Sequence, residues 1–474
     1  MKEAIFKPKQ SMGLLVKRPE LLFVILSLVF GLLFIFRLAP LSGTDEFTHF
    51  PRLYQISEGT FWEQHLPGNQ FGGQLPVNVN NMINDYRNLS RFPTGNSYLQ
   101  GRAQLNAKYS SISNPGARRV TAYFTSTLIY PPWAYFPSLI GLMIAKGLGL
   151  SLIWYVYLSR IANLVVWMLL CYFAIKLIPS GKWFLLVLAL TPTAITQGAT
   201  IGGDGLLMGL SWLLIASVLM FCANKKIVNL WWMLGILFVA AYTALIKDGY
   251  FLLGLTPLVI PLTRFKTKTI GALFKGVNAA AVLVIAFLFT LRTVHAVHGV
   301  VLTPTVGMNL NSTEQISYMT HHLFPYAWHI VEEPFTKVFD TTYLGLVGII
   351  TNRLIYLSIL VIGLIYLCLF YAYAKTQPIR AISIKLKSSK WLVAIFILIF
   401  YLSYLLLASA FYIGNTSVGS TFVNGFYGRY FLPILPLLLV LPLSIRRKKQ
   451  DESHLPITAI GSLVGLVAMV LSLQ

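Results

Sequence analysis

The chain is short of acidic residues and of charge in general. Its 474 residues include 15 Asp and Glu against 37 Lys and Arg, and charged residues make up only 11%. Hydrophobic residues reach 56%, in repeated apolar runs long enough to cross a bilayer. This composition excludes a soluble globular protein. We expect an all-α polytopic membrane protein, folded as a single domain over residues 1–474.

Cysteine is also scarce, and the three cysteines all lie in apolar runs, so no disulfide framework is expected. Glycine-rich nucleotide-binding motifs and the Gly-x-Ser-x-Gly nucleophile motif are absent. The formal net charge of +22 does not indicate a nucleic-acid partner. The basic residues instead cluster in short segments between apolar runs, as they do in the cytoplasmic loops of membrane proteins.

These basic clusters predict the topology. We expect about eleven spans in the bacterial cytoplasmic membrane, with the N-terminus inside and a retained first span at about 21–38. Residues 42–150 then form a first outer loop with interfacial helices, and residues 297–345 form a second. The clusters that mark the inner side lie at 2–18, 176–182, 225–226, 264–275, 380–390 and 446–449.

The apolar run 130–150 allows two topologies. The first outer loop must begin and end outside, so the run cannot be a complete crossing. It contains Pro131, Pro132 and Pro137 and several glycines, which favours a helix that lies along the interface or dips into it. The alternative is a true span, which would place the 176–182 turn outside.

Two of the rare acids, Asp45 and Glu46, are adjacent and follow the first predicted span. An outer carboxylate at that boundary can act as general base on an acceptor hydroxyl, or can hold a divalent cation. The alternative is a helix N-terminus that Thr44 or Asp45 caps, which would explain only one of the two acids.

Two more residues are expected at the outer boundary. Asp204 follows Gly202 and Gly203 between two predicted spans, and the alternative role for it is also an N-cap. Lys247 ends another span outside, where it can pair with a lipid phosphate as a point charge. The alternative is a solvated turn in which Lys247 pairs with its neighbour Asp248.

Two arginines occur in apolar surroundings. Arg160 lies inside an apolar run, where an unpaired charge is costly, so it must be paired or line a polar cavity, unless it extends to the interface. Arg429 opens a span from the outside and is a candidate for phosphate recognition through its guanidinium group. The histidines at 321, 322 and 329 match no zinc spacing and are interpreted as a loop feature.

In order along the chain, these residues form a recognisable set of motifs. They read Asp45-Glu46-x-x-His49-Phe50-x-Arg52, then Tyr130-Pro-Pro, Arg160-x-x-Asn163 and Gly428-Arg-Tyr-x-x-Pro. The set resembles the bacterial membrane family called domain of unknown function 2142, over most of the chain. More distantly it resembles the GT-C superfamily of membrane glycosyltransferases, such as aminoarabinose transferase and the protein O-mannosyltransferases.

The resemblance implies a GT-C-like bundle and a polyprenyl-phosphate-linked sugar as donor, used on the extracytoplasmic face. It implies that Asp45 is the base, that Glu46 supports it or a cation (Mg or Mn), and that Asp204 is the later outer acid. Lys247 corresponds to a lysine near the donor phosphate. We add Arg429 and Arg160 as donor-phosphate ligands, and we place the substrate with the remaining motif residues His49, Arg52 and Tyr130.

The acceptor is expected to be a cell-envelope glycan or a lipid, because the chain lacks the large soluble C-terminal domain of some relatives. Two other functions stay open at this point. One is a polysaccharide polymerase or ligase that uses a lipid-diphosphate-linked glycan, and the other is a lipid or sugar transporter. A blind pocket on the outer side favours the transferase, whereas a continuous polar path favours transport.

Overall fold

The computed structural model describes residues 18–472, apart from 63, 68–69, 90–95, 128–129, 225, 298–309, 338–344, 348–354, 378–385 and 445–453. The predicted inner segments at 2–17 and 446–449, most of the segment at 380–390, and much of the second predicted outer loop lie outside the described residues. The described chain is predominantly helical, with 75% helix and 4% strand.

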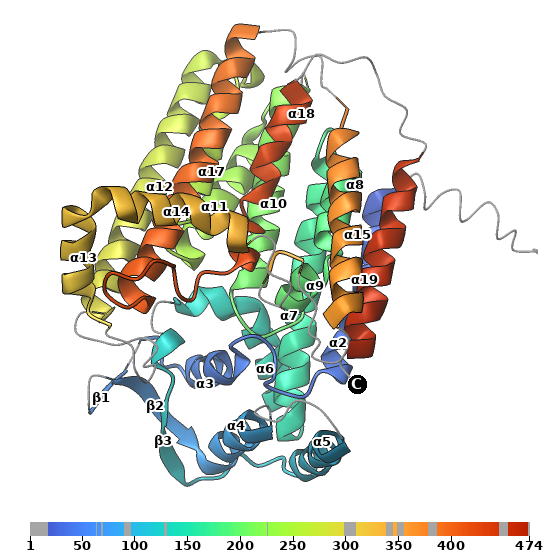
Figure 1. Ribbon diagram of the computed structural model, residues 1–474, viewed down its shortest axis with the longest axis vertical. Helices are drawn as coiled ribbons and strands as arrows, with labels where there is room; N and C mark the ends of the chain where they lie inside the picture. Colours follow the sequence, from blue (N-terminus) through green and yellow to red (C-terminus); the bar gives the residue numbers. More distant parts are fainter. Residues whose placement is uncertain are drawn as a thin grey trace, which may run out of the picture.

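Among the described residues, five helices are long and apolar enough to cross a membrane. With three shorter apolar helices they stand side by side along the long axis of the molecule (Figure 1). The described helices thus support a membrane bundle, while the count of about eleven spans stays a prediction. The five are α2 (Pro19–Arg37), α7 (Leu152–Leu177), α10 (Asp204–Ala223), α12 (Lys268–Val297) and α17 (Leu386–Asn415), and the shorter ones are α11 (Leu230–Ile246), α15 (Ile355–Ala374) and α19 (Thr458–Ser472).

Burial separates the centre of this bundle from its periphery. In α10, 89% of the most apolar window is buried, whereas in α12 only 28% is buried. A helix that is apolar all round and buried all round belongs to the core, and one that is apolar and exposed faces lipid. The helix that begins with Asp204 is therefore central.

Several apolar segments are broken rather than continuous. The segment after α7 is split into α8 (Lys182–Ala189) and α9 (Pro192–Gly198), because Pro192 cannot continue a helix and Thr191 caps a new one, accepting a hydrogen bond from the Ala194 N–H at 3.2 Å. Irregular backbone at membrane depth is tolerated where it lines a protein cavity. The other short elements are η3 (Phe251–Val259), η4 (Leu262–Arg264), η5 (Gly428–Phe431), η6 (Leu435–Leu439), α18 (Val440–Ser444) and η7 (Leu455–Ile457).

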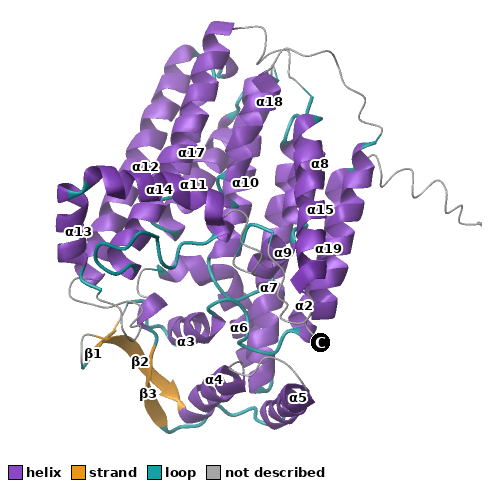
Figure 2. Ribbon diagram, in the orientation of Figure 1, coloured by secondary structure: helices purple, strands orange, loops and turns teal. Residues whose placement is uncertain are grey.

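The first predicted outer loop forms a separate layer across one end of the bundle, called the outer layer here after its predicted side. It includes a small β-sheet (Figure 2). The antiparallel strands pair Gln64 with Gly72, and Gly72 with Tyr123. The expectation of an all-α protein is therefore wrong in this layer. It consists of α3 (Glu46–Ser57), β1 (Gln64–Leu66), β2 (Gln70–Pro76), α4 (Val77–Leu89), α5 (Asn96–Ser110), β3 (Arg119–Tyr123), η1 (Thr125–Thr127), η2 (Pro132–Tyr135) and α6 (Phe136–Gly147).

The run 130–150 forms no continuous crossing. Its helix, α6, has 12 residues, which corresponds to a length of about 18 Å against a hydrocarbon core of about 30 Å. The helix packs closely on α7, since a Cβ at Gly141 would lie 2.1 Å from the Leu158 carbonyl oxygen. At the other edge, α13 (Ser312–His321) and α14 (Leu323–Lys337) pack against α17.

Candidate functional site

The candidate site lies where the outer layer meets the helix bundle. Four segments meet there: the start of α3, the start of α10, the end of α11 and η5. One ion pair joins α3 to η5, and another joins α10 to the end of α11. The pattern of basic residues predicts that these four segments lie on the same side of the membrane. Their contacts in the structure agree with that prediction. Asp45, Asp204, Lys247 and Arg429 come together here.

Asp45 is the exposed carboxylate of the site. Its Oδ2 accepts a hydrogen bond from Arg429 Nη2 at 3.0 Å, and its side chain is 53% exposed. Asp45 occupies the N-cap position of α3, yet its side chain makes no capping hydrogen bond, and no described residue bonds to Thr44 Oγ1. Simple helix capping, the alternative, therefore does not account for the Asp45 side chain.

The backbone of Asp45 is left-handed, with φ of 58° and ψ of 9°. Asp adopts this conformation more readily than most residues other than glycine, but it still costs free energy. Such outliers concentrate at functional sites. Here the conformation accompanies two divergent side chains, because Asp45 reaches Arg429 while the next residue, Glu46, is fully buried.

Lys247 and Asp204 form the second ion pair, with Nζ and Oδ1 3.0 Å apart. The Lys247 ammonium also lies over two rings, 4.3 Å from the Tyr430 centroid and 5.2 Å from that of Tyr130. Burial alone would lower the pKa of Lys247, but the attraction of Asp204 and the nearby tyrosines outweighs it and raises this pKa well above its ordinary value. Lys247 therefore stays charged, and its partner is Asp204 rather than Asp248.

His49 and Tyr130 complete this cluster. His49 Nδ1 is 2.7 Å from the Tyr135 hydroxyl, and its ring packs edge-on against Tyr130 with centroids 4.9 Å apart. Burial lowers the pKa of His49, against the attraction of Asp45 and Asp204. The imidazole is therefore neutral at neutral pH and presents an uncharged wall to the site.

Glu46 has a different environment from Asp45. Its side chain is fully buried, and its two oxygens accept four hydrogen bonds. Oε1 accepts from Arg160 Nε at 3.0 Å and from the Ile201 N–H at 2.8 Å. Oε2 accepts from Arg160 Nη2 at 2.5 Å and from the Gly43 N–H at 2.9 Å. With both oxygens so engaged, Glu46 cannot share a cation with Asp45, and we reassign it from catalysis to structure.

Arg160 is also fully engaged. Besides Glu46, it donates to the carbonyl oxygens of Ile35 and Leu38 at 3.1 Å and of Ala39 at 2.9 Å. These carbonyls belong to the last turn of α2 and to the residues just after it, where helix carbonyls lack intrahelical partners. All five N–H bonds of the guanidinium are used within the protein. Arg160 thus has no donor left for a phosphate, contrary to the role expected from the sequence, and it is paired rather than extended to the interface.

Arg52 also lies apart from the ion pairs. It is buried, and its guanidinium donates to the Gln55 side chain at 2.6 Å and to the Phe61 carbonyl at 2.6 Å. These bonds fix the turn after α3. They give Arg52 a role in the outer layer, and its predicted substrate role stays a prediction.

A cation held jointly by Asp45 and Glu46 does not fit this geometry, since their carboxylates face different partners. Within the part of the chain that the structure describes, no three His, Cys, Asp or Glu residues come together as metal ligands. Of the adjacent pair, Asp45 keeps an accessible carboxylate for a ligand and Glu46 does not.

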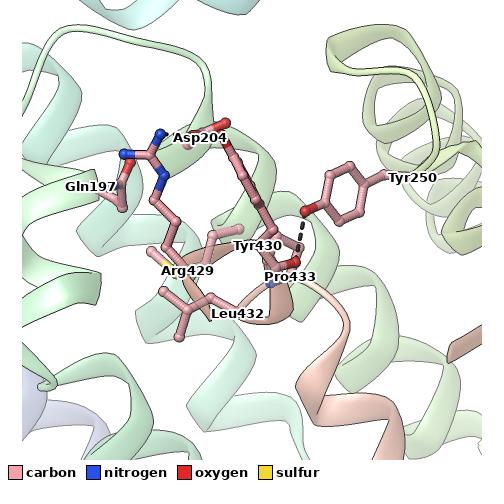
Figure 3. A pocket seen from close by; sticks show the side chains of 8 residues that line it. Gln197, Asp204, Tyr250, Arg429, Tyr430, Leu432 and Pro433 are labelled. Atoms are coloured by element: carbon pink, nitrogen blue, oxygen red, sulfur yellow. Dashed lines mark hydrogen bonds between the residues drawn. The ribbon is translucent and has the colours of Figure 1, made fainter. Parts of the chain in front are cut away.

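A pocket opens beside Asp204 and Arg429, one member of each ion pair (Figure 3). Arg429 projects into it, and Tyr250 supports the wall by donating a hydrogen bond to the Tyr430 carbonyl at 2.7 Å. No described residue bonds to Arg429 Nε or Nη1, although the side chain is only 4% exposed. The lining residues are Gln197, Asp204, Met208, Tyr250, Arg429, Tyr430, Leu432 and Pro433.

Comparison with known families matches residues 28–438 to one described as "Predicted membrane protein (DUF2142)". The match covers most of the chain. The chain belongs to this family. No curated protein and no solved structure matches. The family resemblance expected from the ordered motifs is thereby confirmed, while the likeness to GT-C glycosyltransferases stays a prediction.

One residue of this DUF2142 site was not predicted from the sequence. Gln197 lines the pocket, is only 7% exposed, and has an Nε2 without a partner among the described residues. A single glutamine matches no motif. The available signal was a glutamine in the threonine-rich segment 191–200, which begins at the Thr191-Pro192 break.

Proposed function

We propose that this DUF2142 protein is an integral membrane glycosyltransferase. It moves a sugar from a polyprenyl-phosphate donor to a cell-envelope glycan or lipid acceptor, with inversion at the anomeric carbon. Its site faces the extracytoplasmic side of the bacterial cytoplasmic membrane, and its N-terminus lies in the cytoplasm. Family membership and the apolar helices support the membrane part of this proposal, and the site supports the chemistry.

One observation carries the proposal. An accessible carboxylate, Asp45, lies at the end of an apolar bundle against a buried arginine, two of whose nitrogens have no partner among the described residues. The carboxylate supplies a base for an acceptor hydroxyl, and the arginine supplies positive charge for a phosphate leaving group. A lipid-linked donor reaches such a site from the bilayer.

In the proposed reaction, Asp45 takes the proton of the acceptor hydroxyl. The acceptor oxygen attacks the anomeric carbon from the face opposite the phosphate, and a new C–O bond forms. The bond between the anomeric carbon and the phosphate oxygen breaks, and its electron pair leaves with the lipid phosphate. The products are the glycosylated acceptor, the lipid phosphate and a protonated Asp45.

Charge stabilisation comes from Arg429 and Lys247. Negative charge develops on the leaving phosphate oxygen, and fixed cations in a water-poor site stabilise it more than water does. Lys247 is held by Asp204 and two rings, so it is already oriented before substrate binds. Asp204 then has the role of positioning Lys247 rather than of a second base.

The test is sugar transfer in reconstituted membranes with a panel of labelled polyprenyl-phosphate sugars. Asp45→Asn is expected to lower transfer by about 10²–10⁴-fold, because a general base contributes that much. The matched control is Asp85→Asn, whose carboxylate bonds Lys108 and Tyr109 in the outer layer, away from the site, and which is expected to retain transfer.

Other results would reject the proposal. Unchanged transfer by a folded Asp45→Asn protein would exclude Asp45 as the base. Transfer only from a lipid-diphosphate-linked glycan would identify a polymerase or ligase. Movement of labelled lipid or sugar across the bilayer without transfer would identify a transporter.

A further inference from the structure

Gln197 is a buried polar residue in an unusual situation. It lies near the end of α9, is only 7% exposed, and its Nε2 bonds to no described residue. Leaving a buried N–H unpaired costs free energy, so native proteins pair nearly all such groups. An unpaired amide that lines a pocket therefore points to a ligand.

The Gln197 backbone is fixed by close packing. A Cβ at Gly205 would lie 2.5 Å from the Gln197 carbonyl oxygen, so only glycine lets the first turn of α10 approach α9 this closely. A Cβ at Gly198 would lie 2.4 Å from the Trp167 ring. These contacts hold the Gln197 backbone against the first turn of α10, and the residue lines the pocket.

Gln197 and Arg429 project into the pocket beside each other (Figure 3). Arg429 contributes Nε and Nη1, which have no partner in the described part of the chain, and Gln197 contributes Nε2. Several buried N–H donors without acceptors require a ligand with several acceptor oxygens and negative charge. A phosphate group has both properties.

Part of the pocket wall is apolar. Met208, Leu432 and Pro433 also line the pocket. A free phosphate ion gains nothing from such a wall, whereas a phosphate that carries a hydrocarbon chain buries apolar surface against it. The lining thus combines N–H donors suited to a phosphate group with apolar surface suited to a hydrocarbon chain.

We propose that Gln197 binds the phosphate group of a lipid phosphate as a neutral N–H donor beside Arg429. The proposal rests on the proposed function and adds a specificity residue to its donor site. Two carboxylates adjoin this site. Lys247 neutralises Asp204, and Asp45 shares Arg429 with the incoming phosphate. The Asp45 carboxylate therefore competes with the ligand.

The experiment measures equilibrium binding to the full-length protein in nanodiscs. The probes are polyprenyl phosphate, the corresponding polyprenol without phosphate, and inorganic phosphate. Wild type is expected to bind polyprenyl phosphate in preference to both others. Gln197→Met, which keeps the volume but removes the donor, is expected to weaken this binding roughly tenfold, the effect of losing one hydrogen bond to a charged group. Gln197→Glu is expected to abolish it, by placing a carboxylate beside Arg429.

Gln315→Met is the matched control. Gln315 is also buried, but it is fully bonded, donating to the Tyr412 carbonyl at 3.1 Å and accepting from the Gly419 N–H at 3.0 Å. Gln315→Met is expected to lower the thermal midpoint and leave lipid-phosphate binding unchanged. Gln197→Met is expected to keep or raise the midpoint, because no protein hydrogen bond is lost.

Asp45→Asn separates this proposal from the proposed function. It removes the competing carboxylate, so it is expected to bind polyprenyl phosphate at least as tightly as wild type while sugar transfer is lost. Lipid-phosphate binding that depends on Gln197, without transfer of any sugar by wild type, would keep the binding site and reject the transferase. Wild-type affinity in folded Gln197→Met and Gln197→Glu, or equal affinity for inorganic phosphate, would overturn the inference.

Discussion

Asp45 and Glu46 are adjacent in the sequence and differ in almost every physical respect. Glu46 is fully buried and accepts four hydrogen bonds, two of them from an arginine that is itself saturated. Asp45 is half-exposed and accepts a hydrogen bond from one nitrogen of Arg429. Arg429 keeps two nitrogens without partners in the described residues, whereas Arg160 keeps none.

Two adjacent acidic residues need not share one role. A carboxylate whose oxygens are fully bonded inside the protein holds elements together, and one that keeps open positions can do chemistry. Glu46 and Arg160 join the end of α2 to α7 and to the turn before α10. The left-handed backbone of Asp45 then leaves its carboxylate free to face the pocket arginine.

Removing Arg160 gives the largest expected change in stability. Arg160→Met leaves Glu46 buried without its cation and three carbonyls without donors, so we expect a loss of about 3–5 kcal/mol in unfolding free energy. Thermal or denaturant unfolding in detergent measures it. The double variant Glu46→Gln/Arg160→Met is expected to lose less than the sum of the single variants. Strict additivity would show that the two residues do not act as a unit.

Gly43 gives the next largest effect. A Cβ there would lie 2.5 Å from Thr200 Cγ2 and 2.6 Å from Glu46 Cδ. Gly43→Ala is therefore expected to cost about 1–3 kcal/mol, the usual cost of overpacking, measured as a lower thermal midpoint. Gly147→Ala is the control, because a Cβ there meets nothing within 4 Å. Equal midpoints for both variants would contradict tight packing around Glu46.

His49 gives the smallest effect, and it depends on pH. Burial lowers its folded-state pKa below the ordinary value of 6.5. Below pH 6.5 the unfolded chain gains a proton on His49 before the folded chain does, so stability falls from there towards the folded pKa. Thermal midpoints of His49→Gln are expected to fall less than those of wild type over this acidic range. Parallel curves would show that His49 titrates normally.

Much of the site could be predicted because charged residues are rare in this sequence. Charged residues at the ends of apolar runs have few structural explanations, and Asp45, Asp204, Lys247 and Arg429 meet in space as their predicted side of the membrane requires. Their separate roles could not be predicted. Only the fold shows that four donors surround Glu46, or that Arg160 reaches the end of α2, because several of those partners are backbone groups.

Other features left little signal in the sequence. The strands of the outer layer have three to seven residues and are rich in Gln and Gly, which gives no clear alternation of apolar and polar residues. The broken segment α8–α9 reads as a single apolar run interrupted at Pro192. A role for Gln197 can be inferred only from the fold, in which Arg429 and residues of α10 line a pocket beside it.

The most direct test of the account compares Asp45→Asn with Glu46→Gln, measuring both thermal stability and polyprenyl-phosphate sugar transfer. Asp45→Asn is expected to unfold within about 1 kcal/mol of wild type, because the Asp45 side chain is 53% exposed and an asparagine oxygen can still accept the Arg429 hydrogen bond, and it is expected to lose transfer. Glu46→Gln is predicted to lose several times more stability, because it leaves Arg160 buried without its anion, and to retain transfer in the fraction that stays folded. The reverse pattern, with a stable but inactive Glu46→Gln and an active Asp45→Asn, would contradict the assignment of the two acids.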